Sequence, residues 1–390
     1  MYERKILNRL KTKVEQPHRI IQLIQGPRQT GKTTLIKQLI KTLDIPSFYV
    51  SAEDSITNNE SWIHQQWKIA RAKLDASASN EMLMIIDDIQ KIQSWKKAVI
   101  SEWEEGNTKE RNIQLIVVTT NLPTFSQPSS GNFEITQIPH WSFNEMQEAF
   151  GFTAEQYALY GGYPKVSNYM YDENDMRSYI MDSVIEKTLS KDVFRMDRIN
   201  KPALFNEFFQ LACTYSGQIH SFTRFLSQLN NAGNTTTLSH YTKLLDEAGL
   251  IAGIGKMQEK KTGQRGSIPK WQVQNNALLF VKEKTNLQEI ILTPEKWDFY
   301  IESSIGAHLL NIARHNNMNL YYWKNIHHEV DFILQSGQQK TAIEIQSHYK
   351  NRKPGIKSFV KKHVPDKIFL IGKGGTPWKD FLKKEADDFF

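Results

Sequence analysis

A glycine-containing loop between an aliphatic run and a helical segment is the feature that most limits what this chain can fold into. Residues 20–24 have the character of a buried strand, residues 26–33 read Gly-Pro-Arg-Gln-Thr-Gly-Lys-Thr, and residues 35–42 have the pattern of a helix. This order of strand, loop and helix is the context in which such a loop binds nucleotide phosphates. The two glycines let the backbone curl, so that its N–H groups and the helix N-terminus face the phosphates. The first part of the chain is therefore predicted to bind ATP.

The residues of this loop have different expected roles. Lys32 supplies a positive charge to the β- and γ-phosphates, and the Thr33 hydroxyl is placed to ligate Mg²⁺. The residues expected to contact the nucleotide are Gly26, Pro27, Arg28, Gln29, Thr30, Gly31, Lys32, Thr33 and Thr34.

Two carboxylates follow a second apolar run, because residues 82–88 read Met-Leu-Met-Ile-Ile-Asp-Asp. A buried strand with a polar end would look similar, but carboxylates at the C-terminal edge of a parallel sheet lie where ligands bind. Asp87 is predicted to join the Mg²⁺ shell, and Asp88 to act as the general base that polarises the attacking water. Thr120 follows the next apolar run, at 113–118, and is a candidate contact of the γ-phosphate, although hydroxyl residues are also ordinary in turns.

The pattern of apolar segments divides the chain into parts. Up to about residue 140, short aliphatic runs alternate with longer polar-patterned segments, which predicts a parallel sheet with helices on both faces. From about residue 142 the pattern is helical, and residues 221–273 read as helix, turn, helix and a two-stranded hairpin, the outline of a winged helix. From about residue 297, a helix followed by several strands and a basic helix predicts a third, small α/β unit. The aliphatic runs of the first part lie at 20–24, 48–50, 82–86, 113–118 and 133–138.

Composition limits the cellular setting. No apolar run reaches the ~18 residues that a membrane span needs, so a soluble protein without a membrane partner is expected. Cys213 is the single cysteine and cannot form an internal disulfide, and the N-terminus lacks a signal-peptide pattern, which together predict a cytoplasmic protein. The net charge of +7 permits association with a polyanion, but on net charge alone a solvated surface is the favoured explanation.

Several motifs together resemble a prokaryotic AAA+ ATPase family whose C-terminal region has no characterised function. These motifs are the loop at 26–33, the run Ile-Ile-Asp-Asp-Ile-Gln-Lys-Ile at 85–92, His-Trp-Ser-Phe at 140–143, Gly-Gly-Tyr-Pro at 161–164, Lys191-Asp192, Tyr-Trp-Lys at 322–324 and Glu-Val-Asp-Phe at 329–332. The resemblance implies an AAA+ core at 1–150, a helical lid at 151–200, a winged helix at 201–290 and a PD-(D/E)xK nuclease-like domain at 291–390. The implied fold class is α/β, with a P-loop parallel-sheet core and a small C-terminal α/β domain.

The chain departs from this family's pattern in three places. Asp87-Asp88 stands where the family usually has Asp-Glu, which shortens the water-activating side chain by one methylene. Gly131-Asn132 stands where many members have Gly-Arg, and that arginine resembles one that acts in trans, so rapid ring-type hydrolysis is not expected. In the nuclease-like part, Glu302, Asp331 and Glu344 match the carboxylates of the nuclease pattern, but Gln346 replaces its lysine.

The sequence leaves open whether the client of such an ATPase is DNA or a protein. The second helix of the predicted winged helix is expected to present Thr237, His240, Tyr241 and Lys243 to phosphates, together with Lys260, Lys261 and Arg265 of the following turn. Winged helices also dock proteins, so a protein partner is the alternative. A denser basic segment contains Lys350, Arg352, Lys353, Lys357, Lys361 and Lys362. The sequence thus predicts an ATP- and Mg²⁺-dependent regulator or remodeller of DNA or a protein, and leaves a homo-oligomer open. The rivals are an ATP-gated nuclease and a nucleotide switch that does not hydrolyse ATP.

Overall fold

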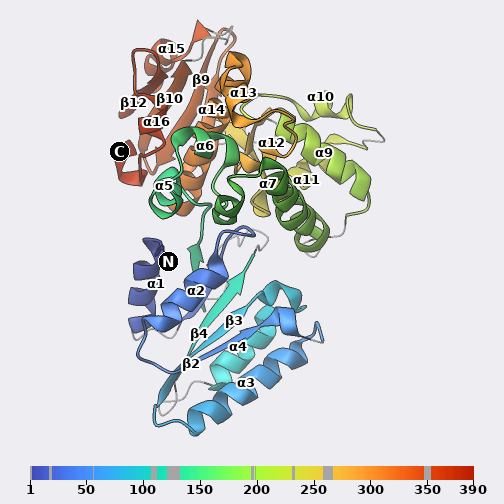
Figure 1. The fold of residues 1–390 in the computed structure, drawn as a ribbon, viewed down its shortest axis with the longest axis vertical. Helices are drawn as coiled ribbons and strands as arrows, with labels where there is room; N and C mark the ends of the chain where they lie inside the picture. Colours follow the sequence, from blue (N-terminus) through green and yellow to red (C-terminus); the bar gives the residue numbers. More distant parts are fainter. Residues whose placement is uncertain are drawn as a thin grey trace. The chain divides into compact units, whose positions relative to one another are not determined.

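The computed structural model describes residues 2–16, 20–55, 57–106, 112–120, 132–194, 197, 199–230, 233–257, 267–346 and 353–390. The chain forms two compact units, Met1–Ile138 and Pro139–Phe390. Figure 1 shows the elements of both units, coloured along the sequence.

The first unit is built on a parallel sheet of five strands in the order β2-β3-β4-β1-β5. β1 lies between β4 and β5, so the segment that follows it emerges at the sheet's carboxyl edge beside the ends of these two strands. The α/β class and the five predicted strands are confirmed. The strands are β1 Ile21–Gln25, β2 Ser47–Ser51, β3 Glu81–Asp87, β4 Asn112–Thr119 and β5 Phe133–Gln137.

Helices cover both faces of this sheet. Successive side chains of β3 point to opposite faces of the sheet, and both faces are apolar. Leu83 and Ile85 belong to one apolar core, while Met84 and Ile86 belong to the other. The first core is shared with α1 (Ile6–Glu15) and α2 (Lys32–Lys41), and the second with α3 (Glu60–Asp75) and α4 (Trp95–Gly106). Two short 3₁₀ turns, η1 (Ala52–Asp54) and η2 (Ile89–Lys91), follow β2 and β3.

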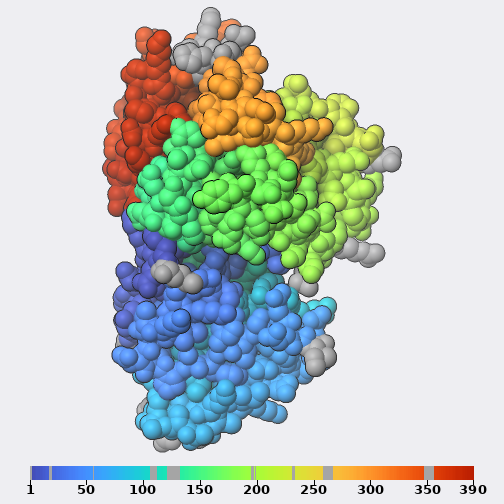
Figure 2. Space-filling model, in the orientation of Figure 1, coloured from blue at the N-terminus to red at the C-terminus, as the bar shows by residue number. Residues whose placement is uncertain are grey.

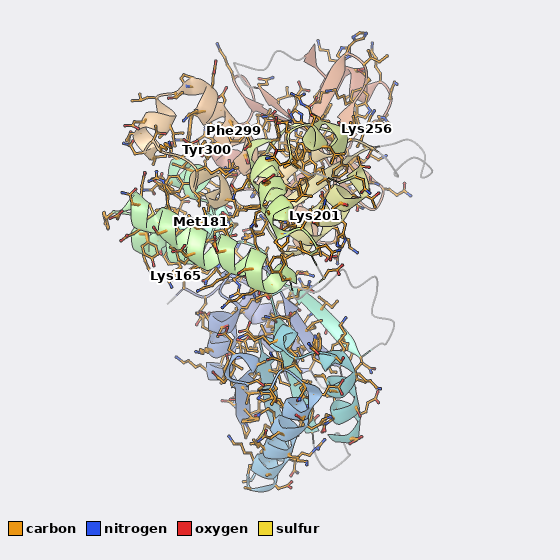
Figure 3. The ribbon with its side chains drawn as sticks, turned by 90° about the vertical axis from the view of Figure 1, so that its right-hand side faces the viewer. Lys165, Met181, Lys201, Lys256, Phe299 and Tyr300 are labelled. Carbon is orange, nitrogen blue, oxygen red and sulfur yellow. The ribbon has the colours of Figure 1, made fainter. Side chains whose placement is uncertain are left out.

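The second unit begins with helices whose starts are fixed by capping side chains. Ser142 and Glu145 form a capping box at the start of α5, and Thr153 and Gln156 form another at the start of α6. The helical segments of this unit are α5 Phe143–Phe150, α6 Ala154–Tyr160, η3 Pro164–Tyr169, α7 Glu173–Tyr179, η4 Ile180–Glu186, η5 Thr188–Val193, α9 Pro202–Thr214, α10 Phe222–Leu226, α11 Thr235–Glu247, α12 Ala277–Phe280, α13 Leu287–Ile291, α14 Pro294–His315, α15 Ile356–Val360, α16 Trp378–Phe381 and η7 Ala386–Phe389. In Figure 3, Met181 lies on the long helix formed by α7 and η4, and Lys201 lies just before α9.

A mixed sheet runs through the second unit in the order β12-β10-β9-β8-β6-β7, and β11 pairs with β9. The antiparallel hairpin β6–β7 was expected in a separate winged-helix domain. Instead, β6 pairs with β8 through Gly255↔Tyr321 and Lys256↔Tyr322, so the hairpin extends the C-terminal sheet. The strands are β6 Ile251–Lys256, β7 Lys270–Val273, β8 Asn319–Lys324, β9 His328–Ser336, β10 Gln339–Gln346, β11 Lys353–Pro354 and β12 Lys367–Gly372.

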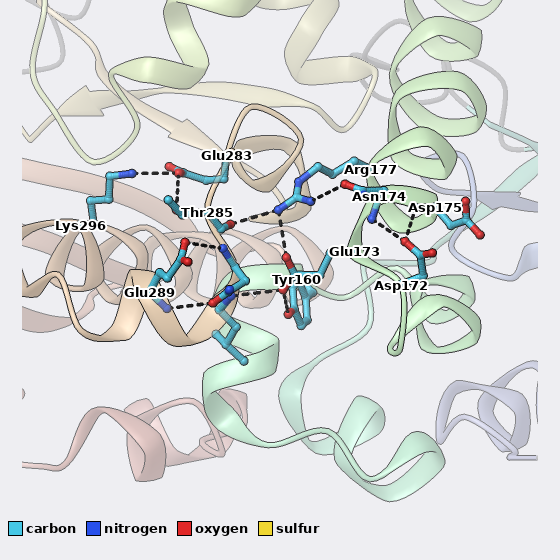
Figure 4. Close-up of polar contacts among 12 residues, drawn as sticks. Tyr160, Asp172, Glu173, Asn174, Asp175, Arg177, Glu283, Thr285, Glu289 and Lys296 are labelled. Atoms are coloured by element: carbon cyan, nitrogen blue, oxygen red, sulfur yellow. Dashed lines mark hydrogen bonds and ion pairs between the residues drawn. The ribbon is translucent and has the colours of Figure 1, made fainter.

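A polar network centred on Glu173 ties helices of the second unit together (Figure 4). Glu173 Oε1 accepts hydrogen bonds from the Tyr160 hydroxyl at 2.6 Å and from the backbone N–H of Leu287 at 3.2 Å. Arg177 donates from Nη2 to Glu173 Oε2 at 3.0 Å and to the carbonyl of Thr285 at 3.1 Å. The network joins α6, α7 and the segment before α13, which lie within one continuous surface in Figure 2.

None of the helices in the described part of the chain combines the length and the apolar character that a membrane crossing requires.

Candidate nucleotide-binding site

The predicted phosphate loop connects β1 to α2, and the sheet packs closely around its first glycine. The backbone N–H of Gly26 donates to the carbonyl of Thr119, at the end of β4, over 3.4 Å. A side chain at position 26 would place its Cβ only 2.3 Å from the carbonyl oxygen of Ile138. Glycine is therefore required here by the close approach of another backbone segment.

The turn into α2 depends on the second glycine. Gly31 has a φ of 86° and a ψ of 22°, a left-handed conformation that glycine adopts without steric cost. The carbonyl of Gly31 accepts from the N–H of Leu35 at 2.9 Å, and the Thr30 hydroxyl donates to the carbonyl of Pro27 at 2.9 Å. The loop residues predicted to contact nucleotide thus lie before α2 and in its first turn, where backbone N–H groups have no partner within the helix.

Lys32 lies beneath this loop. Its side chain is buried, with 7% of its surface exposed, and Nζ lies 2.8 Å from the carbonyl oxygens of both Gly26 and Pro27. These two contacts hold the ammonium group against the curve of the loop. The charge is therefore fixed where the loop would receive phosphates.

Asp87, at the end of β3, is brought to the first turn of α2. The Thr33 hydroxyl donates to Asp87 Oδ2 at 2.7 Å, and the Tyr49 hydroxyl donates to the same oxygen at 2.9 Å. Burial and the negative charge of Asp87 both raise the pKa of Tyr49, so its hydroxyl stays protonated and donates. Tyr49 was not foreseen as a site residue. Its strand was predicted, but only the pairing of β2 with β3 shows that it reaches Asp87.

Asp88 and Thr120 lie at the ends of neighbouring strands and share a partner. Gln90 donates from Nε2 to Asp88 Oδ1 at 2.9 Å, and its Oε1 accepts from the backbone N–H of Thr120 at 3.3 Å. Burial, followed by the negative charge of Asp87, raises the pKa of Asp88. Gln90 lies in the Asp-Asp-Ile-Gln run that supports the family resemblance, but no role was predicted for it.

These groups fit a nucleotide with its metal ion. The carboxyl edge of the parallel sheet brings together three features. They are the loop whose close packing at Gly26 leaves no room for a Cβ, the buried ammonium group of Lys32, and the hydrogen-bonded pair of Thr33 and Asp87. Hydroxyl and carboxylate oxygens are the ligands that Mg²⁺ prefers, and the loop with its lysine suits phosphates.

Two of the carboxylates that match the nuclease pattern lie beside a lysine that the sequence analysis did not single out. Lys270, on β7, is fully buried, and its Nζ lies 3.2 Å from both Oδ1 and the backbone carbonyl oxygen of Asp331. The same Nζ lies 3.8 Å from Glu302 Oε1. An ammonium group of the chain thus lies beside two of the three carboxylates that match the nuclease pattern.

The third carboxylate, Glu344, has other partners. Its Oε2 accepts from the backbone N–H groups of Gly355 at 3.1 Å and Ile356 at 3.0 Å, while Asp331 Oδ2 accepts from the N–H of Ile345 at 2.8 Å. Gln346 is exposed at the end of β10. Within the described ranges, no group of three or more His, Cys, Asp and Glu side chains is arranged to hold a metal ion.

The predicted phosphate-contacting surface of α11 is partly wrong. Tyr241 is buried, because its ring packs against Phe205 and Phe208 of α9. His240 faces Asp197 with Nε2 3.2 Å from Oδ2, and Lys243 is exposed. Lys357, Lys361 and Lys362 are exposed on and beside α15. Lys260, Lys261, Arg265, Lys350 and Arg352, as well as the side chain of Lys353, lie outside the described residues.

Comparison with known proteins supports the predicted ATPase domain in the first unit. Residues 18–147 match the family described as "AAA domain". Residues 152–286 and 298–377 match two families described as domains of unknown function, DUF8612 and DUF4143 respectively. The expectation of an AAA-type P-loop ATPase domain is thereby confirmed for residues 18–147. Among curated proteins, none matches the chain.

Solved structures give distant similarities. A Walker-type ATPase of Pyrococcus abyssi is 10% identical with a TM-score of 0.48, over 72% of this chain and 95% of that protein. The ORC1 protein of Aeropyrum pernix, solved with DNA, is 12% identical with a TM-score of 0.34, over 74% and 92% respectively. The RuvB Holliday junction branch migration motor of Thermotoga maritima is 16% identical with a TM-score of 0.32, over 63% and 85%. These values are too low for an activity or a partner to be transferred.

Proposed function

We propose that the first unit binds ATP with Mg²⁺ and hydrolyses it slowly, and that the second unit is the part that engages a DNA or protein client. The observation that carries the proposal is the convergence of Lys32, Thr33 and Asp87 at one end of the sheet. The Thr33 hydroxyl is 2.7 Å from Asp87 Oδ2, and the ammonium group of Lys32 is fixed under the adjacent loop.

Each group has a proposed role that follows from its chemistry. The loop N–H groups and Lys32 would bind the phosphates, and Thr33 and Asp87 would hold the Mg²⁺, whose charge would offset the negative charge of the phosphates. Tyr49 orients Asp87 through its hydrogen bond. Asp88 accepts a proton from the attacking water, and a raised pKa brings a carboxylate nearer the working pH of a general base. Thr120 remains a proposed contact of the γ-phosphate.

The proposal for the second unit rests on its exposed basic groups and on its central ion pair. Lys243, Lys357, Lys361 and Lys362 offer exposed cations that suit a phosphate backbone or an acidic protein surface. Lys270 beside Glu302 and Asp331 argues against a metal-dependent nuclease, which needs those carboxylates for cations.

Turnover of ATP by the purified chain, with Mg²⁺ and with or without DNA, separates the three candidate functions. A DNA-directed regulator should show slow turnover that changes when DNA is added, and a regulator of proteins should show turnover that DNA leaves unchanged. An ATP-gated nuclease should degrade the DNA. Tight ATP binding with no turnover would support a nucleotide switch and contradict the proposed hydrolysis.

Lengthening the proposed base should speed hydrolysis. Asp88 holds its carboxylate about one methylene farther from the water than a glutamate would, and misplacement by roughly 1 Å can cost on the order of a hundredfold in rate. Asp88→Glu is therefore expected to raise kcat, with ATP affinity unchanged, in a steady-state phosphate-release assay. If nucleotide affinity is intact but kcat stays the same or falls, another residue acts as the base.

The second unit is expected not to cut DNA. Lys270 lies beside Asp331 and Glu302, and Glu344 accepts two backbone hydrogen bonds, so a cation would have to displace several existing partners. Supercoiled and linear DNA should stay intact with Mg²⁺ or Mn²⁺, with and without ATP. Nicking by the wild type that disappears in Glu344→Ala would show an active nuclease and contradict this prediction.

A further inference from the structure

We propose that Gln90 is a positioning residue for ATP hydrolysis, which orients the Asp88 carboxylate and ties it to the end of β4 at Thr120. The inference rests on the proposed hydrolysis and adds to it a residue whose side chain carries no charge. The Gln90 carboxamide is hydrogen-bonded through both its nitrogen and its oxygen.

The backbone at Asp88 is unusual. Asp88 has a φ of 54° and a ψ of 33°, a left-handed conformation uncommon for residues other than glycine. Its N–H donates to Oδ1 of Asp87 at 2.8 Å, so the turn out of β3 is fixed by the preceding carboxylate. The Asp88 side chain makes no capping hydrogen bond to η2. Its orientation therefore depends on contacts from other side chains.

Gln90 supplies such a contact. Its Nε2 donates to Asp88 Oδ1 at 2.9 Å, which leaves Oδ2 of that carboxylate for another partner. The hydrogen bond from Gln90 to Oδ1 restricts rotation of the Asp88 carboxylate, and this restriction also fixes the position of Oδ2. Positioned groups of this kind contribute to rate because a catalytic group must be aligned with the proton that it accepts.

The second contact of Gln90 determines which way its carboxamide points. The Thr120 N–H can only donate, so the group that faces it at 3.3 Å must be the carbonyl oxygen, and the NH₂ group must then face Asp88. A carboxylate in the same place could accept from Thr120 but could not donate to Asp88. The chemistry therefore requires an amide and not merely a polar side chain of this length.

The contact also links two strands. β3 and β4 are neighbours in the sheet, with Ile86 paired to Val117, and Asp88 and Thr120 each follow one of these strands. Gln90 bridges the ends of the two strands at the carboxyl edge, where ligands of parallel sheets bind. A shift of the β4 end would therefore be transmitted through Gln90 to the Asp88 carboxylate.

Two substitutions test this role. Gln90→Ala removes both contacts, and the nearly isosteric Gln90→Glu keeps the acceptor for Thr120 but loses the donor to Asp88. Both are expected to lower kcat by roughly tenfold to a hundredfold, whereas the Kd for Mg·ATP should stay within about twofold of the wild-type value. Both variants should remain folded at the assay temperature, which circular dichroism checks. Gln93→Ala removes an exposed glutamine two residues after η2 and serves as the control, with wild-type kcat expected.

A double-mutant cycle identifies the route of the effect. In an Asp88→Ala background, Gln90→Ala should cause no further loss in single-turnover rate, because the residue acts through Asp88. Wild-type kcat in Gln90→Ala or in Gln90→Glu, or equal losses from Gln90→Ala in both backgrounds, would contradict the inference while leaving the proposed hydrolysis intact. Absence of turnover in the wild type would instead contradict the proposed function, and the Gln90 inference with it.

Discussion

Lys32→Ala is expected to remove ATP binding. Lys32 is buried beneath the loop with Nζ 2.8 Å from two loop carbonyls, so its charge is fixed where the phosphates would lie. Backbone donors alone cannot neutralise the β- and γ-phosphates, and buried hydrogen bonds to charged groups contribute roughly 1.5–3 kcal/mol each. The affinity for Mg·ATP should fall by about a hundredfold or more in a titration with a fluorescent nucleotide.

The control for this experiment is another lysine of the same helix. Lys41 is exposed in the last turn of α2, and Lys41→Ala should bind nucleotide as the wild type does. Undiminished affinity in Lys32→Ala would mean that the loop is not the nucleotide site. Equal losses in both variants would point to a general effect on α2 instead.

Lys270→Met is expected to destabilise the second unit strongly. The substitution leaves Asp331, which is fully buried, without the ammonium group 3.2 Å from its Oδ1, and it also removes the ammonium group 3.8 Å from Glu302 Oε1. Removing one partner of a buried ion pair typically costs about 3–5 kcal/mol, because the remaining charge is left without compensation in the protein interior. Urea unfolding, followed by circular dichroism, should show this loss in the transition of the second unit.

A surface ion pair in the same sheet provides the comparison. Lys324 Nζ lies 3.1 Å from Glu329 Oε2, but the lysine side chain is 47% exposed. Lys324→Ala should cost no more than about 1 kcal/mol, since exposed pairs contribute little. If Lys270→Met proved as mild as Lys324→Ala, the pairing of Lys270 with Asp331 would not hold the second unit together.

Local sequence signals predicted the elements of the fold well. The five aliphatic runs of the first part became β1 to β5, because buried parallel strands need continuous apolar residues. The helix predicted at 143–150 has those bounds in the structure, since Ser142 and Gly151 mark its two ends with a capping box and a left-handed residue. Such signals act over a few residues and can be read without knowing the fold.

Contacts between segments that are far apart in the sequence could not be predicted from such local signals. Pairing of β6 with β8 joins two parts that the sequence pattern separates, because nothing local specifies which strand edge meets which. Tyr49 reaches Asp87 only because β2 lies beside β3. Lys270 comes from a strand and lies 61 residues before Asp331, whereas the nuclease pattern places its lysine at position 346, where this chain has Gln346. In α11, Tyr241 was predicted on the exposed side, but packing on α9 buries it.

Single-turnover hydrolysis tests the central claim most directly. Excess enzyme is mixed with radiolabelled ATP and Mg²⁺, and bound ADP is followed over time in the wild type and in Asp88→Ala. The wild type should convert all bound ATP to ADP, whereas Asp88→Ala should bind ATP equally well and hydrolyse it roughly a hundredfold more slowly, as expected for loss of a general base. Bound ATP that remains intact in the wild type, or an Asp88→Ala variant as fast as the wild type, would contradict the proposed mechanism.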